Sequence, residues 1–298
     1  MRPRPPIPFA ATPLLLVLAC AAPGPVEDVL RPGEDVQPPG ELPPADAAAR
    51  AGLSPLERAE LDQARVDAAA TAARAALERD PESYERLLDA GRELFLAADL
   101  RIQRATLEVL RAEPEAELGR VLDAEDRVPR AVKEEVRALC SAGADVSERA
   151  VELDPESVAA RQYLALHRTL LAWAEGAASA FLRGMGPKVE GAIEAAVELD
   201  PAYDDAAPLR LRGRFRSQAP WPLRDLAGGR ADLERALAMA PIPLHYLYLG
   251  DARFAAGDAQ GAAAAWRAAL DAEGSGMPFT IELHRELARA RLRALGGR

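Results

Sequence analysis

The 298-residue sequence has little of what β-structure requires. It contains no convincing run of alternating β-branched residues and no Asn-Gly pair of the kind that closes a hairpin. Aromatic residues make up only 5% of the chain, although 49% of it is hydrophobic, and much of that share is Ala and Leu. The composition therefore argues against a sandwich or barrel and predicts an all-α protein.

The sequence also lacks the usual signatures of an enzyme. Its three histidines, His167, His245 and His284, have no metal-ligand companion three or four residues away, and there is no Gly-x-Ser-x-Gly elbow. Residues 184–191 contain glycines and a lysine but lack the Gly-Lys-Ser/Thr ending of a phosphate loop, so we expect a helix break there. We predict a non-enzyme with no metal and no cofactor, and histidines at the surface or in packing contacts, although a site assembled from separate repeats stays open.

The net charge limits the class of partner, and the cysteine content limits the disulfides that the chain can form. The formal net charge is −10, which argues against nucleic acid. There are only two cysteines, Cys20 and Cys140, so a disulfide framework is not expected. Cys140 lies in an apparent helix, where a lone cysteine is typical of a small core residue rather than a nucleophile.

The N-terminal region has the features of an export signal and a tether. Residues 1–19 combine Arg2 and Arg4 with a short apolar stretch, and they end in a segment that resembles the lipobox of bacterial lipoproteins, Val17-Leu18-Ala19-Cys20. That resemblance implies lipidation of Cys20; an ordinary secretory leader or a chance cysteine are the alternatives. Ala21 favours the outer membrane, on its periplasmic face. Residues 20–52 are rich in Pro, Gly, Ala and acidic residues and are expected to be a disordered tether before a helical domain at 53–298.

One short phrase recurs along the chain. Helix-favouring residues with a small residue five positions before a proline lead to Pro81, Pro155, Pro201 and Pro241, and a looser copy ends at Pro114. The five prolines are 33, 41, 46 and 40 residues apart, which predicts stacked helical pairs with insertions of roughly seven to twelve residues in the longer intervals. Each Asp-Pro pair is expected to end one helix and cap the next, and Ser54-Pro55-Leu56-Glu57 is a strong helix start.

The clearest unit spans residues 243–276 and resembles the tetratricopeptide repeat. The matching positions are Tyr246, Leu249, Gly250, Gly257, Ala262, Trp266 and Ala269. The resemblance implies a right-handed superhelix of helix-turn-helix units, in which Gly250 and Ala262 allow close helix approach and Trp266 fills the space between units. A helix over 278–296 is expected to cap the array, with Arg285, Arg289, Arg291 and Arg293 on its solvated side.

Residues 186–240 carry a second resemblance, to the T-component family of TRAP transporters. The similar stretches surround Pro187, Asp200-Pro201, Leu209 to Arg214, Ala219 to Leu223 and Ala231 to Leu237. This resemblance implies a lipid-anchored periplasmic adaptor that contacts a solute-binding protein and encloses a channel for an apolar ligand. Arg212, where the family has a packing leucine, and Pro208, which interrupts the helix, depart from the pattern.

Six residues form the predicted partner-binding site. Arg210 and Arg214 share one helix face, and aligning Gly213 with Gly250 places them on a concave groove. The set expected at the binding surface is Arg210, Arg214, Leu244, Leu247, Asp251 and Trp221. For the two arginines the alternative is a solvated face balanced by Asp204, Asp205 and Asp225. Trp221, between two prolines, is either an exposed anchor or a plug over a helix gap.

These observations predict a membrane-tethered scaffold that binds another envelope protein, with a TRAP-type solute-binding protein as one candidate. Two other functions stay open: a carrier of an apolar small molecule inside the superhelix, and a purely structural lipoprotein. The sequence also leaves a homo-oligomer open.

Overall fold

The computed structural model describes residues 53–274 and 278–296, and every regular element in those ranges is helical. The α-helices and one 3₁₀ helix, η1, are α2 (Pro55–Arg79), α3 (Tyr84–Ala112), α4 (Leu118–Leu122), η1 (Ala124–Arg127), α5 (Arg130–Leu153), α6 (Val158–Glu175), α7 (Ala177–Leu182), α8 (Met185–Leu199), α9 (Tyr203–Gln218), α10 (Leu226–Met239), α11 (Pro243–Ala255), α12 (Ala259–Asp271) and α13 (Pro278–Gly296). The prediction of an all-α fold is confirmed.

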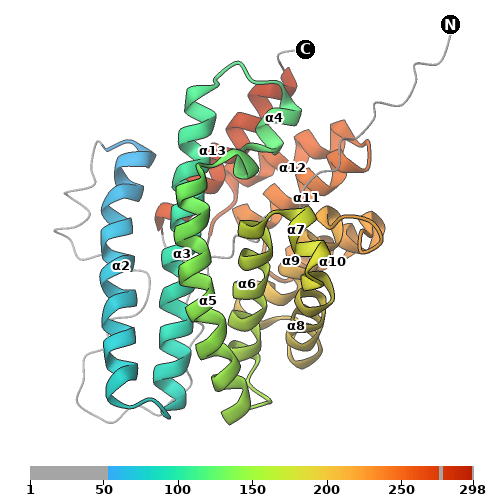
Figure 1. Cartoon of the computed structure of the whole chain (residues 1–298). Helices are drawn as coiled ribbons and strands as arrows, with labels where there is room; N and C mark the ends of the chain where they lie inside the picture. Colours follow the sequence, from blue (N-terminus) through green and yellow to red (C-terminus); the bar gives the residue numbers. More distant parts are fainter. Residues whose placement is uncertain (1–52, 275–277, 297–298) are drawn as a thin grey trace, which may run out of the picture.

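The helices form an array of stacked pairs. Helix α2 packs against α3, α5 against α6, α9 against α10, and α11 against α12. Contacts of α3 with α5 and of α10 with α11 join neighbouring pairs, and α8 links the two middle pairs by packing on α6 and on α9, so the chain advances through the array from α2 to α13 (Figure 1). This is the repeat architecture that the recurring phrase predicts.

The helix starts follow the predicted chemistry with one correction. Ser54 and Glu57 form the expected capping box: the Glu57 amide donates to Ser54 Oγ over 3.3 Å, and the Ser54 amide donates to Glu57 Oε2 over 2.7 Å. The Asp-Pro pairs, however, do not cap the helix that follows. Asp154 is the C-cap of α5, and the next N-cap is Ser157, whose Oγ accepts the Ala160 amide over 3.1 Å. The aspartates therefore end helices, because their extended backbone breaks the helical path.

The three long intervals contain three local insertions. The first holds α4 and η1, the second holds α7, and the third holds the connection 219–225 between α9 and α10. The break expected at 184–191 is present only at its start: Gly184 adopts φ 65° between α7 and α8, and residues 185–191 already belong to α8. The expected interruption of α9 at Pro208 is also present, since Asp204, Asp205 and Ala206 take left-handed backbone angles just before it.

The predicted unit at 243–276 contains a close helix–helix contact between α11 and α12. A Cβ added at Gly250 would lie 2.3 Å from Trp266 Nε1, so only glycine fits there without a shift. Trp266 is fully buried, as expected for the residue that fills the space between units. Gly257 makes the turn between the two helices with φ 86°.

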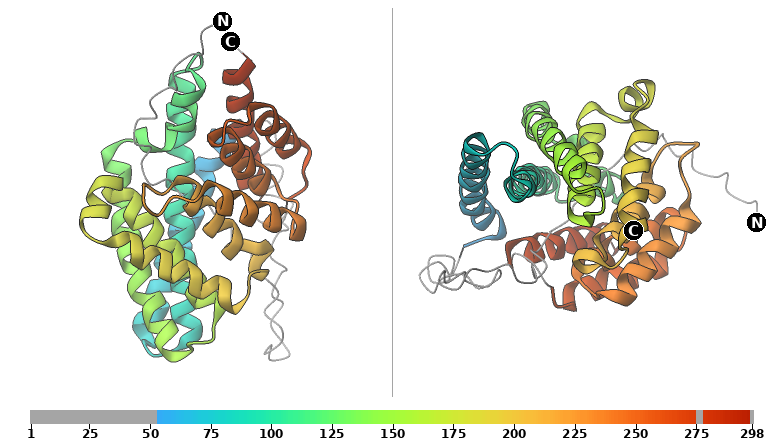
Figure 2. Two further views of the ribbon diagram at one scale, coloured as in Figure 1. Left: turned by 90° about the vertical axis from the view of Figure 1, so that its right-hand side faces the viewer. Right: turned by 90° about the horizontal axis from the view of Figure 1, so that it is seen from below.

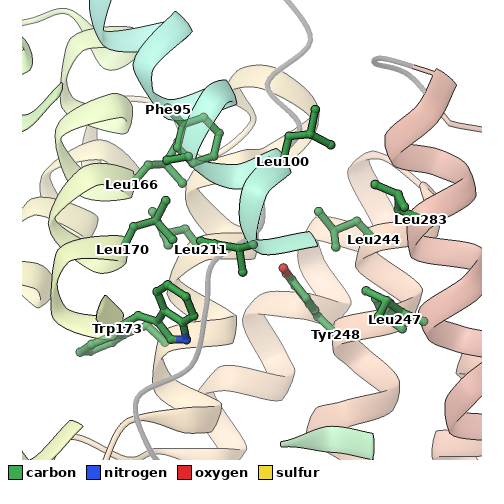
Figure 3. Close-up of a cluster of buried hydrophobic side chains, with 14 of the residues drawn as sticks. Phe95, Leu100, Leu166, Leu170, Trp173, Leu211, Leu244, Leu247, Tyr248 and Leu283 are labelled. Atoms are coloured by element: carbon green, nitrogen blue, oxygen red, sulfur yellow. The ribbon is translucent and has the colours of Figure 1, made fainter. Parts of the chain in front are cut away.

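The last helix does more than cap the array. Helix α13 packs on α12 and α11, and it also contacts α2, α3 and α4 at the opposite end of the chain (Figure 2). Leu283 of α13, Leu244 and Leu247 of α11, and Leu100 of α3 belong to one core (Figure 3). Arg291 was expected on a solvated face but is buried, because α13 is covered on two sides.

Residues 1–52 lie outside the described ranges, so the predicted leader, Cys20 and the tether stay predictions. Within the described ranges, none of the helices combines the length and apolar character needed to cross a bilayer.

Candidate functional site

Five of the six predicted site residues lie together in the interior. Arg210 and Arg214 on α9 face α11, and the Arg214 guanidinium donates to Asp251 over 2.9 Å, so the predicted alignment of the two helices is correct. The predicted open groove is wrong. All five side chains are buried, including Arg210 at 0% and Arg214 at 1% exposure, because α3, η1 and α13 fill the concave side.

Asp251 is the centre of the buried charge network. Its carboxylate accepts from Arg214 over 2.9 Å, from Arg291 of α13 over 2.7 and 3.0 Å, and from Trp266 Nε1 over 3.1 Å. The Arg214 guanidinium also lies over the ring of Tyr248, 4.5 Å from its centroid. One aspartate therefore joins α9, α11, α12 and α13.

The first insertion contributes a further carboxylate. Glu125 on η1 is buried, and its Oε2 lies 3.8 Å from Arg214 with no hydrogen bond. Burial raises the pKa of Glu125 to about 7, although Arg214 and Arg291 oppose the shift. The solvated alternative for the arginines is thus also wrong: Arg214 is balanced inside the array by Asp251 and Glu125.

Arg210 lies in a second polar cluster beside this network. Its Nη1 lies 2.9 Å from His245 Nε2, which must accept because a guanidinium only donates, and His245 Nδ1 donates to Ala240 O over 2.6 Å. Burial, and then Arg210, lower the pKa of His245 to about 3. Burial lowers the pKa of His284 to about 3, and burial raises the pKa of Asp99, although a hydrogen bond with Gln103 opposes that shift. His245 and His284 are therefore neutral packing residues.

The remaining candidates for chemistry are structural. His167 is buried and contacts Gly91 O over 2.9 Å, and burial lowers its pKa to about 4. Cys140 is fully buried, which confirms its prediction as a core residue, and burial raises the pKa of its thiol. Within the described residues, no group of three or more His, Cys, Asp or Glu side chains is arranged to hold a metal ion.

Two other arginines of α9 face outward. Arg212 donates to Asp232 over 2.8 and 2.7 Å and to Glu194 over 2.7 Å, and Arg216 bonds to the same two carboxylates. This network joins α8, α9 and α10 at a half-buried surface. Arg212 thus replaces the expected packing leucine with an ionic contact between the same helices.

The sixth predicted residue is at the surface. Trp221 is 85% exposed, so it is not a plug over a helix gap. Leu182, at the end of α7, is also 85% exposed. The connection that carries Trp221 packs against the first turn of α8, just after the insertion that carries Leu182, because Leu223 Cδ1 would lie 2.7 Å from a Cβ added at Gly186. We call the surface formed by residues 182–188 and 219–225 the insertion edge.

A basic depression lies beside the insertion edge. It has a volume of about 240 Å³ and lies between α6 and α8. Its lining consists of Arg161, Leu164, Arg168, Pro187, Lys188, Gly191, Ala192 and Ala195. Sequence reasoning missed it, because the three cations are separated by up to 27 residues and meet only when α6 packs on α8. Leu182 was also not identified from the sequence. The long interval between Pro155 and Pro201, which indicates an insertion, is the one sequence feature that points to this region.

Comparisons with known proteins give only a structural resemblance. No protein-family model and no curated protein matches the sequence. TTC0263, a thermophilic TPR protein of Thermus thermophilus, is 20% identical, with 79% of this chain and 96% of that one covered and a TM-score of 0.49. BtubC (BKLC) from P. vanneervenii is also 20% identical, with coverages of 75% and 95% and a TM-score of 0.31. The repeat fold is evident from the chain's own helical pairs.

Proposed function

We propose that this chain is a non-enzymatic helical-repeat scaffold that binds another protein at the insertion edge. The observation that carries the proposal is that the connection 219–225 packs against the segment that follows α7, and that Trp221 and Leu182 are each 85% exposed there. Insertions in repeat arrays commonly gather on the binding face. Contiguous exposed apolar surface is typical of interaction sites, and Trp is enriched among binding hot spots.

The interior supports stability instead of binding. Arg214, Asp251 and Arg291 satisfy one another, and α13 covers them. An apolar cargo in the superhelix would have to displace buried, paired charges, which is costly. The described interior therefore favours a protein-binding scaffold over the carrier hypothesis.

We further propose that the scaffold is tethered in the bacterial envelope through a lipid on Cys20 and that its partner is a periplasmic solute-binding protein of the TRAP type. The lipobox-like segment and the resemblance of residues 186–240 to the T-component family support this. A Cys20→Ser variant is expected to leave the membrane fraction. Unchanged fractionation of that variant would contradict the lipid anchor.

A capture experiment tests the binding site. The double variant Trp221→Ala/Leu182→Ala is expected to recover at least tenfold less partner from an envelope extract than the wild type does. The recovered partner is quantified by mass spectrometry. The matched control is Leu153→Ala/Met239→Ala, which truncates two other exposed apolar side chains, each 49% exposed and outside the insertion edge. Equal recovery by both double variants would refute the proposed site.

A further inference from the structure

We infer that the partner segment that binds at the insertion edge is acidic and places carboxylates in the basic depression between α6 and α8. This inference rests on the proposed function and adds the chemistry of the partner. Three cationic side chains line the depression, Arg161, Arg168 and Lys188, and no carboxylate lines it. In a chain with a net charge of −10, such a local excess of positive charge selects for an acidic occupant by complementarity.

Two of the three cations, Arg161 and Lys188, have no carboxylate partner among the described residues. The Arg161 Nε donates to Pro155 O over 2.7 Å, which fixes the guanidinium at the rim of the depression. Arg168 pairs with Glu148 of α5, outside the depression. The Lys188 ammonium makes no hydrogen bond or ion pair that we find within the described ranges, so a partner carboxylate would meet a cation that is not already neutralised.

The floor of the depression suits an extended peptide. Small or apolar side chains form it, and a Cβ added at Gly191 would meet no atom within 4 Å, so the surface is open above α8. Guanidinium groups bind carboxylates with two parallel hydrogen bonds, which gives both strength and orientation. A main chain lying across Gly191 could thus place acidic side chains against Arg161 and Arg168.

The depression borders the insertion edge. Pro187 and Lys188 line it and directly follow Gly186, the residue that Leu223 contacts. One short segment can therefore reach both regions, with carboxylates in the depression and an apolar residue against Trp221 or Leu182. Anionic lipid is a poorer fit, because the acidic surface of the whole chain is repelled by an anionic bilayer.

Selection from a display library of random 12-residue peptides tests the inference on the purified protein. We expect the enriched peptides to carry a net negative charge and at least one large apolar residue. Their affinity, measured by fluorescence anisotropy with labelled peptides, should fall at least tenfold in Arg161→Glu/Arg168→Glu/Lys188→Glu. It should also fall steeply with added salt.

The matched control has the same change in net charge. Arg74→Glu/Arg130→Glu/Arg267→Glu reverses three exposed cations on α2, α5 and α12, away from the depression, and should change the affinity less than twofold. If circular dichroism shows that the triple Glu variant does not fold, Arg161→Gln/Arg168→Gln/Lys188→Gln replaces it. This variant should lower the peptide affinity at least threefold.

The possible outcomes separate the two proposals. Enrichment of neutral or basic peptides whose binding needs Trp221 would overturn the acidic partner and leave the proposed function standing. Peptide binding that is indifferent to Trp221 and Leu182 would overturn the proposed function itself. Binding to vesicles of phosphatidylglycerol and phosphatidylcholine, in place of any peptide, would assign the edge to a membrane and overturn the inference.

Discussion

The interior and the basic depression beside the insertion edge both gather cationic side chains, but the two regions differ in the carboxylates that neutralise them. Inside, Arg214 and Arg291 share Asp251, and all three side chains are at most 3% exposed. Arg161, Arg168 and Lys188 line a depression that no carboxylate lines, and of the three only Arg168 has a carboxylate partner, Glu148 of α5. Removing one partner of a buried charge pair costs the fold much of its stability. Cations in contact with solvent cost little stability to keep, and they stay available to a ligand. The comparison assigns stability to the interior and binding to the edge.

The largest expected effect comes from breaking the buried pairing. Asp251→Asn should reduce the free energy of unfolding by about 3–5 kcal/mol, because it removes the carboxylate charge to which two buried guanidinium groups are hydrogen-bonded. Denaturation in urea measures it. Glu194→Gln is the matched control, since Glu194 also pairs with two arginines, Arg212 and Arg216, but at 30% exposure. It should cost less than about 1 kcal/mol, and equal losses would contradict the comparison.

The next effect depends on pH. Glu125 has a pKa of about 7 in the fold and ionises near 4.5 when unfolded, so the unfolded chain holds fewer protons and stability falls as pH rises from about 4.5 to about 7. Glu125→Gln removes this penalty. Its stability relative to the wild type should therefore rise between pH 5 and pH 8, by up to roughly 3 kcal/mol.

The control for this experiment is built into it. Asp126, whose pKa burial also raises to about 7, and the three buried histidines are present in both proteins, so the difference between them reports Glu125 together with its coupling to Asp126 and Asp99. The same stability difference at pH 5 and pH 8 would mean that Glu125 is ionised throughout. The buried arginines would then stabilise the Glu125 carboxylate enough to offset the effect of burial on its pKa.

A smaller effect is expected at two glycines that distinguish close packing from open surface. Gly250→Ala should cost about 1–3 kcal/mol, because its Cβ would overlap Trp266. Gly191→Ala, on the floor of the depression, should stabilise α8 by up to about 1 kcal/mol, because alanine favours helix and no atom is near. Thermal unfolding of both variants checks the prediction, and a stabilising Gly250→Ala would show that α11 and α12 are not in close contact.

The smallest change in stability is expected at the edge itself. Trp221→Ala/Leu182→Ala should alter the free energy of unfolding by no more than about 0.5 kcal/mol, since both side chains already face solvent. Urea denaturation at fixed protein concentration measures it. A loss of several kcal/mol would mean that these side chains pack against the array, and their exposure could no longer be assigned to partner binding.

The sequence predicts the fold well because its signals are local. Ser54 and Glu57 specify a helix start within four residues, and Gly250 with Trp266 specifies the contact within one helical pair. The unequal spacing of the prolines also predicts the insertions. The sequence does not predict which helices α13 packs against, because its contacts with α2 and α3 join segments roughly 200 residues apart.

That one long-range contact accounts for the error at the predicted site. Arg210, Arg214 and Asp251 do share a concave face, as helical spacing indicates, but α13 covers the face and Arg291 occupies it. Trp221 was identified because a tryptophan between two prolines is conspicuous. The depression was not, since Arg161 and Lys188 have no local relation in sequence and meet only through helix packing.

Hydrogen–deuterium exchange with a bound acidic peptide tests the central claim most directly, because it reports the whole backbone without any substitution. Binding at the insertion edge predicts slower amide exchange in residues 158–199 and 219–225, and no change in α11 or α13. Slower exchange in α11, or faster exchange in α13 as it is displaced from the concave face, would contradict the account and return the binding site to the interior.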